Sequence, residues 1–243
     1  MRQIDRRAGR RKGVLVSAWV YTDGMASREH ATRAEQKLRT RRALLDSALR
    51  LLEEQAIDGL ALREVAREAG LSPTGFYRHF PDIEALGIAL VEDSFSTLRG
   101  MLRSARTEAS GYGDVMQQTV TILHEEVRRN RAHFRFIARE RFSGMAGVRR
   151  AIRTEIRLFE SELAVDLSQL PGLDSLEAVD LRLFASVLVA LMVNTVEELL
   201  EVPVDRPDLE DAVVRSAELR LRLVVVGLAQ WRSGAATGAT ALA

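Results

Sequence analysis

The sequence predicts an all-α protein, with a helix-turn-helix near the N-terminus and a larger helical body after it. Apolar residues recur every three to four positions along most of the 243 residues, as in helices that bury one face, and no strand-like alternation persists. Only 5 prolines and 16 glycines interrupt this pattern, so we expect long helices with short connections. With 47% hydrophobic residues, the chain can bury one or two full cores.

Residues 1–28 are expected to form a basic, disordered N-terminal extension. Six Arg and Lys residues between positions 2 and 12 precede a short apolar stretch at 14–20. A signal peptide needs an apolar core of about 7–15 residues and a cleavage site, and no convincing site follows here. A basic arm, or an extension upstream of a start at Met25, is therefore favoured over an export signal. The absence of cysteine excludes disulfides and thiolate metal sites and fits a cytoplasmic location.

Residues 29–81 are expected to form a three-helix domain. The first helix covers 29–55, and Gly59 behind it can take the left-handed conformation of a helix stop. The second and third helices, 62–69 and 73–79, are short. The first helix has one apolar face at helical spacing, formed by Leu45, Ala48, Leu49 and Leu52.

The segment from Leu62 to Phe80 has the spacing of a helix-turn-helix. Ala66 is small where two helices cross closely, and Gly70 permits a sharp turn between them. Ser72 suits the N-cap of the second helix, and Pro73 suits its first turn. The apolar wedge between the two helices is predicted to consist of Val65, Leu71 and Phe76.

The second helix of this motif presents a short polar face that can enter a DNA major groove. Residues 1–80 carry 16 Lys and Arg against 10 Asp and Glu, whereas the remainder carries 19 against 24. A basic head on an acidic body is typical of proteins that bind phosphates. A plain surface hairpin is the alternative, and the motif and the charge polarity together favour DNA binding. The polar face is formed by Thr74, Gly75, Tyr77, Arg78 and His79.

Residues 82–233 are expected to form a helical ligand-binding and dimerisation domain, followed by a disordered tail at 234–243. The longest nearly apolar run, 183–193, has 11 residues, short of the ~20 that span a bilayer, so no membrane segment is expected. Both this run and 223–228 are apolar on nearly every side, which predicts a homodimer seam. Two-fold symmetry then predicts a palindromic operator, with the recognition helices ~34 Å apart. The expected helices are 82–106, 114–129, 131–142, 148–167, 175–201 and 208–233.

Apolar residues between these helices are candidates for an elongated ligand cavity. Ordinary core packing is the alternative for each of them. Two sets of arginines, 135 and 139 and then 149, 153 and 157, share helix faces; they are either solvated surface or contacts for a carboxylate or phosphates. The candidate cavity residues are Met116, Val120, Leu123, Phe136, Ile137, Phe159, Leu188 and Met192.

The sequence favours a binding protein over an enzyme. It has no glycine-rich phosphate loop and no nucleophile elbow. His124, Glu125, Glu126 and His133 match no standard metal-ligand spacing. We therefore expect no catalytic residues, no metal and no cofactor.

Thr40-Arg41-Arg42 followed by the segment 62–80 resembles the N-terminal DNA-binding domain of the TetR family, over about residues 32–95. The resemblance implies a transcriptional repressor with a three-helix DNA-binding head, a ligand-binding body and a dimer formed by the last two helices. By position, it implies that Thr74 and Gly75 contact bases. Tyr77 and His79 would hold phosphates, and Arg41 and Arg63 the nearby backbone. The full candidate DNA-binding set is Arg41, Arg63, Ser72, Thr74, Gly75, Tyr77, Arg78 and His79.

The chain departs from the family at the start of the following helix. Many members have a lysine there, whereas this sequence has Pro81-Asp82-Ile83-Glu84. A phosphate contact at this point is therefore in doubt. Asp82 is instead expected to be an N-cap, and Glu84 to favour the positive end of the helix.

Within the family, the chain is most similar to the FabR-type repressors of unsaturated fatty acid synthesis. The similarity rests on 63–70, on 76–80 with Leu86-Gly87, and on 130–144, which includes Arg139-Glu140-Arg141. It implies a long-chain acyl-CoA or fatty acid as the ligand and lipid metabolism genes as the target. A dimeric DNA-binding protein without a small-molecule ligand is the alternative.

Overall fold

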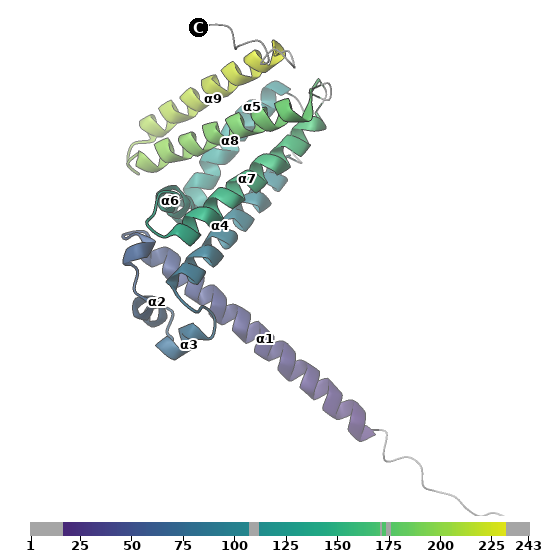
Figure 1. The fold of residues 1–243 in the computed structure, drawn as a ribbon, viewed down its shortest axis with the longest axis vertical. Helices are drawn as coiled ribbons and strands as arrows, with labels where there is room; N and C mark the ends of the chain where they lie inside the picture. Colours follow the sequence, from purple (N-terminus) through teal and green to yellow (C-terminus); the bar gives the residue numbers. More distant parts are fainter. Residues whose placement is uncertain (1–16, 107–111, 171, 174–175, 232–243) are drawn as a thin grey trace, which may run out of the picture. The chain divides into compact units, whose positions relative to one another are not determined.

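The computed structural model describes residues 17–106, 112–170, 172–173 and 176–231. These residues form nine α-helices and one short 3-10 helix, and no strand occurs among them (Figure 1). The all-α prediction is confirmed. The chain divides into two compact units, residues 1–44 and residues 45–243, which are described separately.

The first unit contains most of α1 (Ser17–Leu51). This helix begins at Ser17 rather than at the predicted residue 29, so residues 17–28 are helical where the sequence predicted disorder. Within that stretch Gly24 has the lowest helix propensity, about 1 kcal/mol below that of alanine, and no proline stops the helix from extending. At its exposed surface, the Thr40 hydroxyl donates to the carbonyl of Gln36 at 2.9 Å.

The helix-turn-helix is formed by α2 (Leu62–Glu68) and α3 (Pro73–Tyr77) in the second unit. Gly70 has φ +69°, a conformation that glycine adopts without steric cost. The N–H of Leu71 donates to Ala66 O at 2.8 Å and that of Gly70 to Arg67 O at 3.0 Å, which makes a Schellman stop. The predicted turn at Gly70 is confirmed.

The start of α3 is fixed by its N-cap. The hydroxyl oxygen of Ser72 accepts a hydrogen bond from the backbone N–H of Gly75 at 3.2 Å, and Pro73 occupies the first turn. Both features were predicted from the sequence and are confirmed.

The core of this head is apolar and closed. Val65 and Phe76 are fully buried, whereas Leu71, the third residue of the predicted wedge, is half-buried. The predicted face of α1 is also largely buried, with Leu49 half-buried. A short 3-10 helix, Ile57–Gly59, connects α1 to α2 and buries Ile57 completely. The buried residues of the α1 face are Leu45, Ala48 and Leu52.

The body begins with α4 (Ile83–Arg106), and its first turn is capped as predicted. Asp82 Oδ1 accepts a hydrogen bond from the N–H of Ala85 at 2.7 Å. In Figure 1, α4, α7 and α8 run side by side, and α9 lies outside α8. The remaining helices are α5 (Tyr112–Arg129), α6 (Arg131–Glu140), α7 (Ala146–Ser168), α8 (Ala178–Glu201) and α9 (Pro207–Ala229).

Polar contacts hold these helices together. Arg99 on α4 lies 2.6 Å from Glu155 and 3.3 Å from Glu162, both on α7. The guanidinium of Arg131, at the start of α6, donates to the carbonyls of Leu200 at 2.8 Å and of Val202 at 3.2 Å. A cation at these carbonyls is stabilising because the C-terminal end of α8 carries a partial negative charge.

Head and body are in close van der Waals contact at Gly87 on α4. A β-carbon placed there would lie 2.3 Å from Ile57 Cδ1 and 2.8 Å from Val148 Cγ2 on α7. Both neighbours are fully buried. Only glycine therefore allows the 3-10 helix, α4 and α7 to pack this closely.

Helix α8 has two different faces. Among the helices described, it is the one long and apolar enough to cross a membrane by length and composition, which for a single helix is weak evidence. One face of α8 packs into the bundle through Phe184, Ala185 and Val189. The opposite face leaves apolar side chains exposed to solvent.

Candidate DNA-binding surface and ligand cavity

The two sides of α3 have opposite properties. Phe76 points into the head and is fully buried, with its ring 5.8 Å from that of Phe80. The neighbouring Tyr77 is 59% exposed, and Thr74 and Arg78 are also exposed. The short helix therefore presents a polar surface while a single aromatic side chain anchors it.

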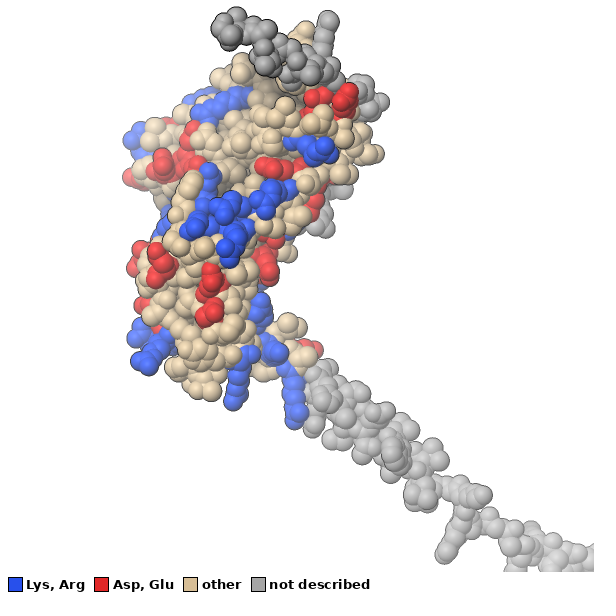
Figure 2. All heavy atoms as spheres, viewed as in Figure 1, with Lys and Arg blue, Asp and Glu red and all other residues tan. Residues whose placement is uncertain are grey.

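The structure places seven of the eight candidate DNA-binding residues on or beside α2 and α3. Arg63 is exposed on α2, whereas Gly75 and His79 are half-buried. Ser72 is exposed, but its hydroxyl oxygen is engaged in the cap. Arg41 lies on α1 in the first unit. Figure 2 shows Lys and Arg side chains at the end of the molecule where α2 and α3 lie.

A cavity of about 110 Å³ lies inside the body, between α4, α5, α6, α7 and α8. Its wall is almost entirely apolar, as in sites for apolar ligands. Four of the sequence-predicted candidates line it: Leu123, Ile137, Phe159 and Met192.

The other candidates lie elsewhere. Val120 packs with Ala217 and Leu221 on α9, and Leu188 packs against the same cluster. Phe136 is buried but does not line the cavity. Met116 lies on α5, and its side chain is not among those that the structure describes. The cavity is thus displaced from the predicted one, away from α9.

Several lining residues were not predicted from the sequence. Besides residues on α5, α6 and α7, they form one row on α4 and one on α8, with members about one helical turn apart, so helical spacing was the available signal. The same spacing is typical of ordinary core residues. Only the three-dimensional packing of α4 and α8 around the cavity distinguishes a lining residue from a core residue. The missed apolar residues include Phe95, Leu98, Val189, Val193 and Val196.

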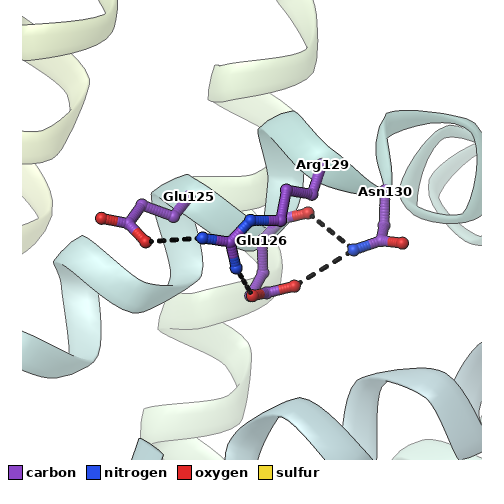
Figure 3. A network of polar contacts seen from close by, with 4 residues as sticks. All are labelled: Glu125, Glu126, Arg129 and Asn130. Atoms are coloured by element: carbon purple, nitrogen blue, oxygen red, sulfur yellow. Dashed lines mark hydrogen bonds and ion pairs between the residues drawn. The ribbon is translucent and has the colours of Figure 1, made fainter.

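Glu126 lines the cavity, but its carboxylate is already paired (Figure 3). One oxygen lies 2.5 Å from Nη1 of Arg129, and the other accepts from the amide of Asn130 at 3.1 Å. Arg129 also contacts Glu125 at 3.2 Å. This network ties the end of α5 to the start of α6 and neutralises the charge of Glu126.

A second charged pair lies at the cavity wall. Nη1 of Arg141 is 2.9 Å from Oε1 of Glu197, and the two side chains are 28% and 32% exposed. The same nitrogen is buried and forms no hydrogen bond of good geometry within the described part of the chain. The guanidinium also lies over the ring of Phe142, 4.6 Å from its centre. Arg141 is therefore neutralised but keeps donor capacity.

Two carboxylates, one buried and one half-buried, bridge elements near the junction of head and body. Glu140, at the end of α6, is fully buried and accepts a hydrogen bond from the backbone N–H of Ile57 at 3.0 Å. Its neighbour Arg139 lies 3.5 Å from the same oxygen. At the start of α4, Glu84 accepts from the N–H of Gly147 on α7 at 2.6 Å. Helix α6 thus contacts both the cavity and the loop that precedes α2.

The candidate arginine sets lie on α6 and α7, where Figure 2 shows Lys and Arg side chains gathered. Arg149 donates to the carbonyl of Ser143, and Arg157 donates to Thr154. His124 and His133 have separate partners, Glu210 on α9 and Ser94 on α4. No cluster of three metal-ligating side chains occurs in the part of the chain searched.

Residues 44–90 match the model of a known family, the bacterial regulatory proteins of the tetR family. Over these residues the chain is similar to the N-terminal domain of that family. The match runs from the end of α1 through α2 and α3 into α4, and it therefore covers the Gly70 turn, the Ser72 cap and the exposed face of α3.

Solved structures show the TetR-type fold over the body as well. A candidate TetR-family regulator from a Rhodococcus species has a TM-score of 0.58 at 19% identity, covering 74% of this chain and 97% of that one. FadR from Bacillus subtilis, solved with stearoyl-CoA, has a TM-score of 0.60 at 17% identity, covering 76% and 97%. AibR, solved with isovaleryl coenzyme A and operator DNA, has a TM-score of 0.55 at 17% identity, covering 73% and 97%.

Proposed function

We propose that this protein is a transcriptional repressor of TetR type, which binds a palindromic operator through α3 and responds to a small apolar ligand in the body. The observation that carries the proposal is the exposed polar face of α3, held by Phe76, the Ser72 cap and the Gly70 turn inside the matched segment. The N-terminal residues of such a helix contact base edges when it enters a major groove.

Thr74 and Gly75 are proposed to contact bases, and Tyr77 and His79 to contact phosphates. Thr74 lies in the first turn of α3, where a side chain reaches the groove floor. Tyr77 lies at the end of the helix and is exposed, which suits a hydrogen bond to a backbone phosphate.

Selection of DNA sequences by the purified full-length protein tests this function. We expect an enriched palindrome whose half-sites are about one helical turn apart. Affinity for that palindrome should exceed affinity for unrelated DNA by about three orders of magnitude or more at physiological salt. Equal affinity for all duplexes would contradict an operator-binding role.

The ligand is proposed to belong to the acyl-CoA or fatty acid class, which links the regulator to lipid metabolism. The apolar wall of the cavity supports this class, and the bound ligands of FadR and AibR are acyl-CoAs. The FabR-type resemblance remains a prediction. If acyl-CoAs do not change the affinity for the palindrome, the protein is instead a DNA-binding dimer without this ligand.

Glu140 is proposed to carry the ligand response from the body to the head. Glu140→Ala is expected to lower the free energy of unfolding by about 3 kcal/mol, because the N–H of Ile57 and the side chain of Arg139 lose a buried acceptor. Glu140→Gln keeps an acceptor oxygen, so its free energy of unfolding should fall by less than that of Glu140→Ala. Urea unfolding of both variants measures the difference. A loss below about 1 kcal/mol in Glu140→Ala would show that the contact contributes little.

A homodimer is proposed to form through α8 and α9. Val179, Leu183 and Val187 are spaced by four residues along α8 and are 57%, 50% and 42% exposed. On the adjacent α9, Leu219 and Leu223 are 67% and 77% exposed. Because α8 and α9 pack against each other, we infer that the two rows adjoin in one apolar surface, which a monomer would leave in water.

Changing this surface is expected to separate the subunits. The double variant Leu219→Asp/Leu223→Asp should be monomeric at concentrations where the unchanged protein is a dimer, because two carboxylates would be buried without partners. Analytical ultracentrifugation measures the mass. The matched control is Val165→Asp on α7, which is 64% exposed and lies on another helix. A dimer that survives the double substitution would place the interface elsewhere.

A further inference from the structure

We propose that the cavity binds a short acyl group, about as large as a benzene ring, and that Arg141 donates a hydrogen bond to its neutral carbonyl oxygen. The inference rests on the proposed ligand response and narrows the ligand from long-chain to short-chain acyl thioesters. It follows from the size of the cavity, from what closes it, and from the charges at its wall.

The cavity is small. Its volume is about 110 Å³, whereas an apolar cavity of roughly 150 Å³ accepts a benzene molecule. Rings and branched side chains form its wall, including Phe95, Phe134 and Phe159. A chain longer by several methylene groups would have to displace these side chains. Such overpacking of a close-packed interior costs about 1–3 kcal/mol. A long acyl chain is therefore disfavoured.

The cavity does not extend past Val120 and Leu188 toward α9, where the sequence-predicted candidates had placed it. Val120 is 95% buried against Ala217 and Leu221, and Leu188 packs on the same cluster. The cavity is therefore closed on the α9 side by packed side chains.

The charges at the wall favour a neutral head group. Both oxygens of Glu126 are occupied by Arg129 and Asn130, so Glu126 offers no binding site for a cation. Nη1 of Arg141 is 2.9 Å from Oε1 of Glu197, which balances its charge, and the guanidinium has four further N–H donors. A thioester carbonyl can accept from Arg141, whereas a free carboxylate would also be repelled by Glu197.

Calorimetric titration of the full-length dimer with a series of acyl-CoAs tests the size. Butyryl-CoA, isovaleryl-CoA and hexanoyl-CoA are expected to bind most tightly, and dodecanoyl-CoA and palmitoyl-CoA at least about 10-fold more weakly. Butyrate and hexanoate are the free-acid arm and should bind at least about 10-fold more weakly than their thioesters. Tightest binding of palmitoyl-CoA would overturn the size inference, and tighter binding of the free acids would overturn the proposed role of the Arg141 pair.

Variants locate the site. Ala138→Leu fills the cavity and should weaken hexanoyl-CoA binding by about 10-fold or more, while Phe159→Ala enlarges it and should move the optimum to a longer chain. Arg141→Gln should weaken all chain lengths equally. The control Val165→Leu lies at an exposed position of α7, outside the cavity and the proposed dimer surface, and should change nothing. Unchanged binding in both Ala138→Leu and Phe159→Ala would place the ligand outside this cavity.

The outcomes for the two proposals are distinct. If no acyl-CoA binds while the operator is still bound, the proposed ligand response itself is wrong. If a long-chain acyl-CoA binds most tightly and releases or strengthens operator binding, the response is right and only the short-chain inference is wrong.

Discussion

Replacing Phe76 with alanine is expected to lower the free energy of unfolding by about 3–5 kcal/mol, the largest stability effect of any single substitution considered for the head. Phe76 is fully buried, lies against Phe80, and is the one buried side chain of the five-residue helix α3. Its removal leaves a cavity that so short a helix cannot close. Urea denaturation followed by circular dichroism measures the loss.

The neighbouring aromatic residue provides the control for Phe76. Tyr77 is 59% exposed, so Tyr77→Ala should change the free energy of unfolding by less than about 1 kcal/mol. Phe76→Ala should weaken operator binding indirectly, because α3 loses its anchor. If Phe76→Ala unfolds at the same urea concentration as Tyr77→Ala, the packing assigned to α3 is wrong.

The double variant Tyr77→Ala/His79→Ala is expected to bind the operator at least about 100-fold more weakly. Each side chain is proposed to donate a hydrogen bond to a charged phosphate, and such bonds contribute about 1.5–3 kcal/mol each. The loss should be similar for operator and unrelated DNA, because phosphates carry no sequence information. Fluorescence anisotropy at one fixed salt concentration measures both affinities.

Thr74→Ala is the contrasting variant for this prediction. Thr74 is exposed in the first turn of α3 and is proposed to contact a base. Its replacement should therefore reduce the preference for operator over unrelated DNA while leaving non-specific affinity unchanged. Operator affinity that persists in Tyr77→Ala/His79→Ala, with a folded head, would contradict the proposed docking.

Local features of the head were predictable from the sequence. The turn at Gly70 and the caps at Ser72 and Asp82 each involve residues within five positions of one another, and a particular residue type is needed at each. The breaks near Pro203 and Pro207 likewise gave the end of α8 and the start of α9. The start of α1 was not predictable in this way, because no residue before Ser17 or within the helix marks a boundary by its type.

The cavity was only partly predictable because it depends on how distant helices pack. Phe136 and Ile137 are adjacent on α6, yet Ile137 lines the cavity and Phe136 does not. Neighbouring positions on a helix point about 100° apart, and the sequence does not say which of two apolar side chains faces a space. The contact between Glu140 and Ile57 joins residues 83 positions apart, and no local pattern indicates it.

The absence of a side chain at Gly87 has a mechanical consequence. At this point the 3-10 helix, α4 and α7 are separated by no more than the space of a hydrogen atom, and the two facing side chains are fully buried. Close-packed atoms transmit displacement rather than absorb it. A shift of α4 or α7 by a fraction of an ångström would therefore displace the 3-10 helix and the loop before α2 as well.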